Sequence, residues 1–316
     1  MEVLPSMENS EEINNSGGYV ADPVNGRFMN TGVVDLKSLY PSAIITWNIS
    51  TETVSTSPDG FDNYVKIPHV PEPKEVEGKI QKDAIDWDWL YASLDEEGII
   101  ARTVKQLFKK RNKQKAKRNQ FDKDTPEYDK WDRKQAATKV IMNSFYGCAS
   151  SPFWRLSNQY LGDAITSCAR YTLWKGERKI EDMGYKHLYS DTDSHFLELT
   201  EDTPEDRVEE LKRVAEALDE DASTIFDDII ETNRESKFDH HPFLKNSDLH
   251  GDEKTCMLWE PEKIYKVFMQ LGKKKRYAGN KEWEEGTFYP EPEISITGFE
   301  ERRSDSMEVT SELQEE

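Results

Sequence analysis

Two long segments with helical periodicity, separated by a short turn, constrain the fold more than any other feature of this sequence. In the first, residues 99–120, apolar residues recur at helical spacing at Ile100, Val104, Leu107 and Phe108. The second is predicted to run from about Glu127 to Tyr146 and to end at Gly147, because glycine is common just after helices. The short turn returns the second helix alongside the first, so the sequence predicts an antiparallel helical hairpin.

The first of these helices carries an unusual charge for this chain. The sequence has 42 basic and 62 acidic residues, a net charge of −20, which by itself repels nucleic acid. Residues 109–118 nevertheless contain no acid. Arg111 and Lys115 lie four positions apart there, and a guanidinium beside an ammonium suits the oxygens of a triphosphate. A solvated basic face is the alternative for this segment.

The second helix carries Lys139, Asn143 and Tyr146 at positions i, i+4 and i+7, which places them along one face. Such a face would line a nucleotide site. The alternative is an ordinary half-buried helix with one lysine extended into solvent, and the helix taken alone favours this alternative.

Short β-strands are predicted on both sides of the hairpin. Residues 17–20 and 32–36 have strand character, and the second run changes abruptly to Ser-Leu-Tyr-Pro-Ser, so Asp35 lies at a strand end. Residues 187–189 and 194–197 are two further β-like runs. The Ser-Asp-Thr-Asp segment between these two runs indicates a hairpin turn.

Two further regions complete the predicted architecture. Residues 50–98 are rich in Pro, Asp, Glu and Ser, and we expect a loop-rich crossing there. Thr203 and Pro204 offer an N-cap and a first helical residue. Apolar residues then keep helical spacing at Val208, Leu211, Val214, Leu218, Ala222 and Ile225. This pattern predicts an amphipathic helix that covers one face of a sheet, and the fold class is predicted to be α+β.

The strand ends provide acids for a metal site. Phosphoryl transfer with two metals needs carboxylates that bridge both ions, and magnesium accepts one or two carboxylates together with water and substrate phosphates. Asp35 at a strand end and Asp191 in a hairpin turn meet that need. Taken alone, the turn Asp191-Thr192-Asp193 is more often a solvated turn than a metal site.

Zinc and membrane features are not predicted. Cys148, Cys168 and Cys256 lie far apart, and the neighbours His240 and His241 have no further ligand at zinc spacing. No run of about 18 apolar residues occurs, and the N-terminus does not match a secretory signal. We therefore expect an intracellular, cytoplasmic protein without a membrane partner.

Several of these segments, in order, resemble the sequence motifs of family B DNA polymerases. Asp35–Ser42 (DLKSLYPS) looks like motif A, Lys139–Gly147 (KVIMNSFYG) like motif B, and Tyr189–Ser194 (YSDTDS) like motif C. Lys274–Tyr277 (KKRY) resembles the element that grips the primer-template duplex in this family, and Gly298–Arg303 resembles the segment leading into the thumb. The order and approximate spacing also agree with the family, and we expect an archaeal or viral member.

The resemblance implies a right-hand polymerase fold, in which a palm made of an antiparallel sheet with covering helices carries fingers made of a helical hairpin. Residues 17–98 would form the first part of the palm, 99–147 the fingers and 148–305 the second part of the palm. Residues 1–16 are expected to be a disordered tail, and 306–316 a tail or the truncated start of a thumb.

The same resemblance implies the ligands and their residues. Two Mg²⁺ ions, with Mn²⁺ as a substitute, would be held by Asp35 and Asp191, with the Leu36 carbonyl as one ligand and Asp193 helping from the second strand. The deoxynucleoside triphosphate would be bound by Ser38, Leu39, Tyr40, Arg111, Lys115, Lys139, Asn143 and Tyr146. Tyr40 would exclude a 2′-hydroxyl. Primer-template DNA would contact Gly147, Thr192, Lys274, Lys275, Arg276 and Tyr277.

Three departures from the family pattern affect the expected function. The family's Tyr-x-Gly-Gly element appears as Asn15-Ser16-Gly17-Gly18, and only 34 residues precede Asp35, where intact members carry a proofreading exonuclease. The chain also stops at Glu316, where a thumb is expected. We therefore expect a catalytic piece of a split, intein-interrupted or fragmentary polymerase, working with the nucleoid or in an infected host cell. Separate polypeptides that carry the exonuclease and the thumb would be its partners.

Two other functions are compatible with these residues. One is a noncatalytic fragment that grips nucleotide or duplex through Arg111, Lys115, Lys139 and the Lys274–Tyr277 cluster. The other is a two-metal nuclease, which would share the carboxylates but has no use for a triphosphate-binding helix or a sugar-excluding tyrosine. The leading prediction is a DNA polymerase that extends a primer from deoxynucleoside triphosphates and releases pyrophosphate.

Overall fold

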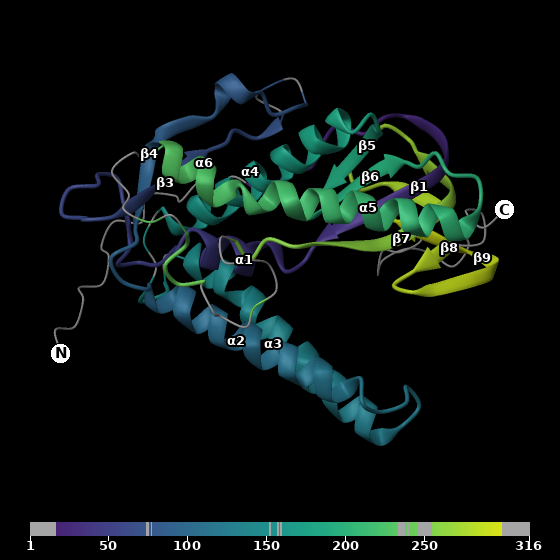
Figure 1. Cartoon of the computed structure of the whole chain (residues 1–316), viewed down its shortest axis with the longest axis horizontal. Coiled ribbons are helices and arrows are strands. Elements are labelled where there is room, and N and C mark those ends of the chain that lie inside the picture. The colour runs from purple at the N-terminus through teal and green to yellow at the C-terminus, as the bar shows by residue number, and fades with distance from the viewer. Residues whose placement is uncertain are drawn as a thin grey trace.

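The computed structural model describes residues 17–298 except 74–75, 77, 152, 157, 159, 233–237, 239, 245–248 and 250–254. Within this part of the chain, helices pack against two antiparallel sheets (Figure 1). The larger sheet has six strands in the order β5-β6-β1-β7-β8-β9, and the smaller has three in the order β2-β4-β3. The predicted α+β class is therefore confirmed.

The six-stranded sheet is organised around β1 (Gly26–Leu36), which pairs with β6 on one side and β7 on the other. Its other strands are β5 (Lys186–Asp191), β6 (Ser194–Glu198), β7 (Trp259–Gln270), β8 (Tyr277–Glu284) and β9 (Thr287–Thr297). The predicted β-hairpin around Asp191 is confirmed as β5-β6. The β1 strand begins earlier than predicted, because Gly26 already pairs with Gln270 of β7.

Two long helices pack on this sheet. One is α4 (Leu161–Asp182), which the sequence analysis did not predict, although it buries an almost continuous run from Leu161 to Leu173. The other is α5 (Pro204–Ser223), where the Thr203 side chain accepts a hydrogen bond from the Asp206 amide, so the predicted N-cap is confirmed. The predicted continuation through Ile225 is wrong, because the helix ends at Ser223 and α6 (Ile225–Thr232) follows as a separate element.

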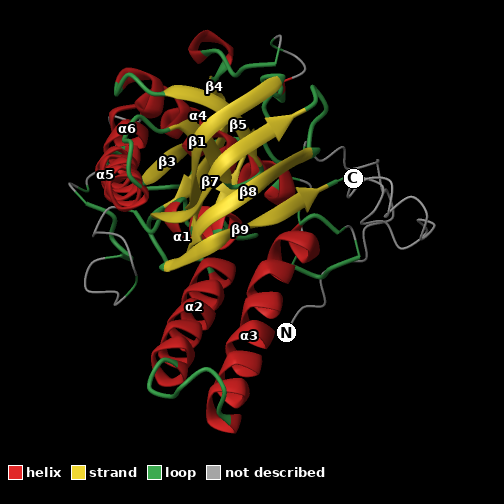
Figure 2. Ribbon diagram, turned by 90° about the vertical axis from the view of Figure 1, so that its right-hand side faces the viewer, coloured by secondary structure: helices red, strands yellow, loops and turns green. Residues whose placement is uncertain are grey.

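The predicted helical hairpin is confirmed. It consists of α2 (Ile99–Arg118) and α3 (Pro126–Ala149), and Figure 2 shows the two helices extending side by side away from the sheets. The prediction that Gly147 ends the second helix is wrong. The buried stripe of α3 continues from Met142 to Ala149, so packing carries the helix past the glycine.

The predicted loop-rich crossing at residues 50–98 is also wrong. This segment forms the smaller sheet, made of β2 (Val54–Ser55), β3 (Tyr64–His69) and β4 (Asp86–Ser93), with a short 3₁₀ helix at Lys82–Ala84. The apolar residues of the strands supply the reason, because Val65, Ile67, Leu90 and Ala92 are fully buried. The pairs Pro58-Asp59 and Pro71-Glu72 lie between the strands, whereas Pro68 lies within β3, where the register with β4 shifts.

Two shorter elements complete the described fold. The helix α1 (Leu39–Thr46) is almost entirely buried and contacts α2, α3 and α4. The predicted strand at residues 17–20 is reduced to a single bridge between Val20 and Asp191, beside a fully buried Tyr19. The predicted tails at 1–16 and 306–316 lie outside the described residues.

Candidate active site

Strand register places several acids in one row at the end of the large sheet. Asp191 of β5 and Asp35 of β1 both lie opposite Ser194 of β6, and Asp35 also lies opposite Glu260 of β7. The Leu36 amide donates a 2.7 Å hydrogen bond to the Asp193 carbonyl, so the hairpin turn is held against the end of β1. Four neighbouring strands therefore bring together residues that are far apart in the sequence.

The electrostatic environment of Asp35 is unfavourable for a bare carboxylate. Its pKa is raised to about 8, first by burial and then by the charge of Asp193, with smaller contributions from Glu262 and Glu260. Lys139 of α3 acts in the opposite direction and lowers the Asp35 pKa. The hairpin lysine is thus close enough to influence the acids of the sheet.

Asp193 has the same kind of environment. Its pKa is raised to about 6 by burial, then by Glu262 and Asp191, while Lys139 lowers it. Glu260 and Glu262 were missed by the sequence analysis. Their alternation in Glu-Pro-Glu at the start of a strand was the available signal.

Asp191 differs from these two acids because it already has a cationic partner. Its Oδ1 lies 2.9 Å from the Lys275 ammonium, and the Thr192 hydroxyl donates to the same oxygen at 3.1 Å. The backbone amide of Lys275 also donates to the Tyr189 hydroxyl. Of the two acids in the turn, Asp193 raises the pKa of Asp35, whereas Asp191 is paired with Lys275.

The acids fit a divalent cation. The described residues contain no group of three or more His, Cys, Asp or Glu side chains that could hold a metal alone. Magnesium needs only one or two carboxylates when water and substrate phosphates complete its shell. A cation between Asp35 and Asp193 would also offset the mutual repulsion that raises the pKa of Asp35.

On the hairpin side, Arg111 joins α2 to the turn after β1. Its Nη1 donates to the Ser38 hydroxyl at 3.3 Å, and its Nε donates to Gln135 of α3 at 3.2 Å. Burial, Arg111 and Lys37 lower the pKa of Lys115, so this lysine is also close to the turn. The predicted pair of cations and the predicted Ser38 are therefore brought together.

The predicted face of α3 is largely open to solvent. Lys139 and Asn143 are exposed, whereas Thr138 and Met142 on the neighbouring face are buried. At the base of this face, the ring of Tyr146 stacks on Tyr40, with 4.5 Å between the centroids. Leu39 is buried at the start of α1, after Ser38 in the left-handed conformation.

The Lys274–Tyr277 cluster lies at the β7-β8 connection. Lys274 pairs with Asp22 at 3.2 Å and Lys275 with Asp191, while Tyr277 packs on Tyr189 and Phe196. Arg276 is half-buried. Gly298 lies against this connection, and a β-carbon there would come within 1.8 Å of the Lys275 carbonyl oxygen. Phe299 to Arg303 lie outside the described residues.

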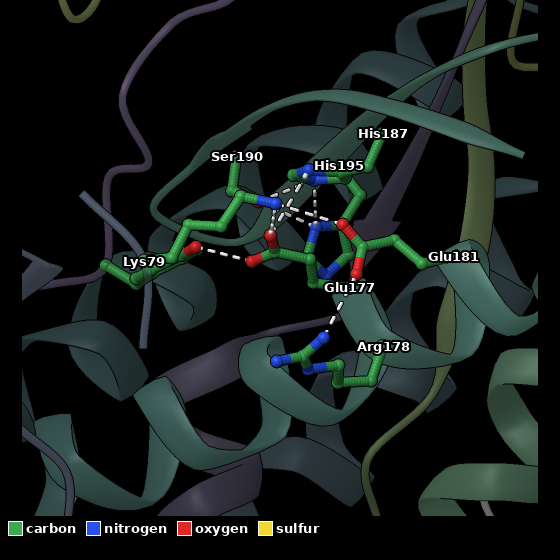
Figure 3. A network of polar contacts seen from close by, with 8 residues as sticks. Lys79, Glu177, Arg178, Glu181, His187, Ser190 and His195 are labelled. Atoms are coloured by element: carbon green, nitrogen blue, oxygen red, sulfur yellow. Dashed lines mark hydrogen bonds and ion pairs between the residues drawn. The ribbon is translucent and has the colours of Figure 1, made fainter. Parts of the chain in front are cut away.

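A largely buried polar network joins Glu177, His187, Ser190 and His195 (Figure 3). Glu177 accepts a 2.5 Å hydrogen bond from the Tyr19 hydroxyl and lies 3.2 Å from the Lys79 ammonium. The His187 ring contacts the Ser190 hydroxyl at 3.0 Å, and Ser190 immediately precedes Asp191. No local sequence pattern predicts this network, because its members come from four separate segments.

The second histidine of the network, His195, connects it to Trp259 of the large sheet. His195 Nδ1 lies 2.7 Å from the Ser190 hydroxyl and 3.1 Å from His187 Nε2, and its ring stacks on Trp259. Burial lowers the pKa of both histidines, which favours the neutral form of each ring. A β-carbon at Gly176 would approach His195 Nε2 to 2.8 Å, so a glycine is needed where α4 crosses the ring.

Among the described residues, no helix combines the length and the apolar character needed to cross a bilayer.

Comparison with known proteins identifies relatives of this chain by sequence. The family model "DNA polymerase family B" matches residues 2–243. A DNA polymerase of Archaeoglobus fulgidus is 31% identical over 193 residues, which are 60% of this chain and 22% of that protein. DNA polymerase 1 of Saccharolobus solfataricus is 33% identical over 185 residues, 57% of this chain and 19% of that protein. The chain thus corresponds to about a fifth of the length of these relatives.

A solved structure supports the same relationship at the level of the fold. The family B DNA polymerase from the hyperthermophilic archaeon Pyrobaculum calidifontis superposes with a TM-score of 0.58 and 21% identity. The match covers 93% of this chain and 30% of that one. Because the family model extends over most of the sequence and includes motifs A to C, the chain belongs to DNA polymerase family B.

Proposed function

We propose that this chain forms the palm and fingers of a template-directed DNA polymerase, which adds deoxynucleoside monophosphates to a primer 3′-hydroxyl and releases pyrophosphate. Residues 17–98 and 148–305 would form the palm, and residues 99–147, which include α2 and most of α3, the fingers. The observation that carries the proposal is the meeting of Asp35 and Asp193 with Lys139. Buried acids beside a basic helical hairpin suit a metal-bound triphosphate.

The carboxylates of Asp35 and Asp193 would hold the two Mg²⁺ ions, or Mn²⁺ in their place, with the Leu36 carbonyl as a further ligand. When bound, the ions would make the primer 3′-hydroxyl a stronger nucleophile and stabilise the negative charge that develops on the leaving pyrophosphate. Asp191 was predicted as the second ligand. Its ion pair with Lys275 favours a supporting role, in which it holds the β7-β8 connection near the primer end.

The fingers would bind the triphosphate. Arg111 offers a guanidinium held in place by Gln135, and Lys115 and Lys139 offer ammonium groups. Ser38 and Leu39 would present backbone amides, and Asn143 would add a polar contact. Tyr40, stacked on Tyr146, would lie under the sugar and exclude a 2′-hydroxyl. Gly147, Thr192 and Lys274–Tyr277 would contact the primer-template duplex.

Primer extension with Mg²⁺ tests this proposal. The chain should be assayed alone and then mixed with polypeptides that carry an exonuclease and a thumb, which are its proposed partners. Templated addition that stops with Asp35→Asn is the expected result. Duplex binding that persists without any turnover in every mixture would instead indicate the noncatalytic fragment.

A further inference from the structure

The helical hairpin has a second basic surface that the proposed active site does not use. A groove of about 850 Å³ between α2 and α3 is lined chiefly by Lys109, Lys110, Lys113, Lys117, Trp131 and Lys134. We call this surface the outer groove. Helical geometry places Lys113 and Lys117 on a different side of α2 from Arg111 and Lys115, so the groove faces away from the acids of the sheet.

The ammonium groups in the outer groove lack acidic partners. Within the described part of the chain, no carboxylate lies within ion-pair distance of the five lysines, and the Lys117 ammonium contacts the neutral side chain of Gln120 and the ring of Phe121. Some exposed lysines elsewhere have acidic partners, as in the pairs Lys79–Glu181 and Lys212–Glu209. In a chain with 62 acidic residues, five clustered lysines without acidic partners indicate a surface that binds a polyanion.

The aromatic ring of Trp131 indicates which kind of polyanion fits the groove. Trp131 is half-buried in the groove, and the Lys134 ammonium lies 4.6 Å from its ring centroid. Unpaired nucleobases stack on such rings while lysines follow the phosphates. An acidic peptide would use the lysines without the ring, and a duplex keeps its base faces covered.

We propose that the outer groove binds single-stranded nucleic acid, with phosphates on the lysines and a base on Trp131. If the proposed polymerase function holds, the strand is the unpaired template; the binding itself does not depend on catalysis. The surface would then hold the template near the fingers while the acids of the sheet act on the primer.

Fluorescence anisotropy with a labelled oligo-dT of about 20 nucleotides, longer than a typical single-strand site, tests the proposal on the full chain. Lys110→Gln with Lys113→Gln should weaken binding about tenfold at low salt and reduce the log–log salt slope by about 1.4. Trp131→Ala should also weaken binding about tenfold, and Trp131→Phe should restore most of it. Thermal melts would verify that each variant is folded.

The matched control removes two positive charges elsewhere on the same hairpin. Lys123 and Arg133 are exposed and do not line the groove, so Lys123→Gln with Arg133→Gln should leave the affinity within about twofold of the parent. Equal weakening by the control, or no weakening by the groove variants, would overturn the proposal. Competition by poly-glutamate that is insensitive to Trp131→Ala would also overturn it, in favour of an acidic protein.

The outcome can be separated from that of the polymerase proposal. Asp35→Asn should abolish primer extension and leave oligo-dT binding unchanged. Extension without any groove-dependent binding would reject the outer groove alone. Groove-dependent binding in a chain that never extends a primer, even with its partners, would reject the polymerase proposal alone.

Discussion

The acidic end of the sheet and the basic helical hairpin are assembled in opposite ways. At the sheet end, Asp35, Asp193 and Glu260 come from distant parts of the chain and meet because β6, β1 and β7 pair. In the hairpin, Arg111 and Lys115 are neighbours by helical spacing alone. The acids at the sheet end are therefore held close together by strand pairing between distant segments. The basic residues of the hairpin are brought together by the helix in which they lie.

Burial differs between the two regions as well. Burial and neighbouring acids raise the pKa of Asp35 to about 8, while the lysines of the outer groove are mostly exposed. Repulsion among half-buried acids persists only where the surrounding structure is rigid. We conclude that substitutions of these acids should be costly for function, whereas loss of the Asp35 charge should relieve repulsion within the fold. The hairpin should tolerate changes outside its proposed substrate contacts.

The largest difference is expected among the aspartates themselves. Asp35→Asn or Asp193→Asn should lower single-nucleotide incorporation by at least about 10³-fold, because each removes a charge that would bind the metals. Asp191→Asn should have a smaller effect, since its partner is Lys275. Single-turnover rates at saturating Mg²⁺ measure this order. An Asp191→Asn defect larger than that of Asp193→Asn would reverse our assignment.

The next effect concerns the stability of the sheet. Arg207 of α5 donates to Glu282 of β8 at 2.6 Å, and both side chains are nearly buried, with 5% and 11% exposed. Arg207→Ala should lower the free energy of unfolding by about 3–5 kcal/mol, because it leaves Glu282 buried without a partner. Urea denaturation measures the loss. Replacing both residues, as Arg207→Met with Glu282→Leu, should recover most of it, and failure to recover would contradict the reason given.

A smaller effect is expected where the hairpin is proposed to bind the triphosphate. Arg111→Lys keeps the charge but removes the fork that reaches both Ser38 and Gln135. The KM for deoxynucleoside triphosphate should rise about tenfold to a hundredfold, with little change in unfolding free energy. Arg133→Lys on the exposed face of α3 is the matched control. A stability loss as large as that of Arg207→Ala would remove the contrast between the two regions.

The smallest effect is expected within the hairpin. Arg118 of α2 and Asp132 of α3 form a 2.8 Å ion pair, with side chains 20% and 42% exposed. Arg118→Ala should lower the free energy of unfolding by about 0.2–1 kcal/mol, since solvent and salt screen this pair. Urea denaturation at low and high salt would check it. A loss above about 2 kcal/mol would show that the hairpin is as tightly coupled as the sheet.

The sequence was most informative where structure is local. The helices of the hairpin, the N-cap at Thr203 and the β5-β6 turn follow from spacing within about 25 residues, and all three were predicted. The predicted end at Gly147 was wrong, because burial of Ala149 outweighed the local signal of the glycine. The smaller sheet was missed because turn-forming residues dominate its composition.

The candidate site was predictable only in part. The motifs and helical spacing pointed to Asp35, Arg111 and Lys139. No local pattern reveals that Asp191 pairs with Lys275, or that Glu262 lies close enough to Asp193 to raise its pKa. The same limit hid the network of Glu177, His187 and His195, whose members meet only after the sheet and α4 pack. Pairings across the sheet decide these contacts, and a single sequence does not contain them.

The most direct test of our account is Mn²⁺ binding followed by electron paramagnetic resonance, in the presence of a deoxynucleoside triphosphate. We predict that Asp35→Asn and Asp193→Asn each release most of the bound Mn²⁺, whereas Asp191→Asn retains it. Undiminished Mn²⁺ binding in the Asp35→Asn and Asp193→Asn variants would contradict the claim that these two carboxylates share the metals.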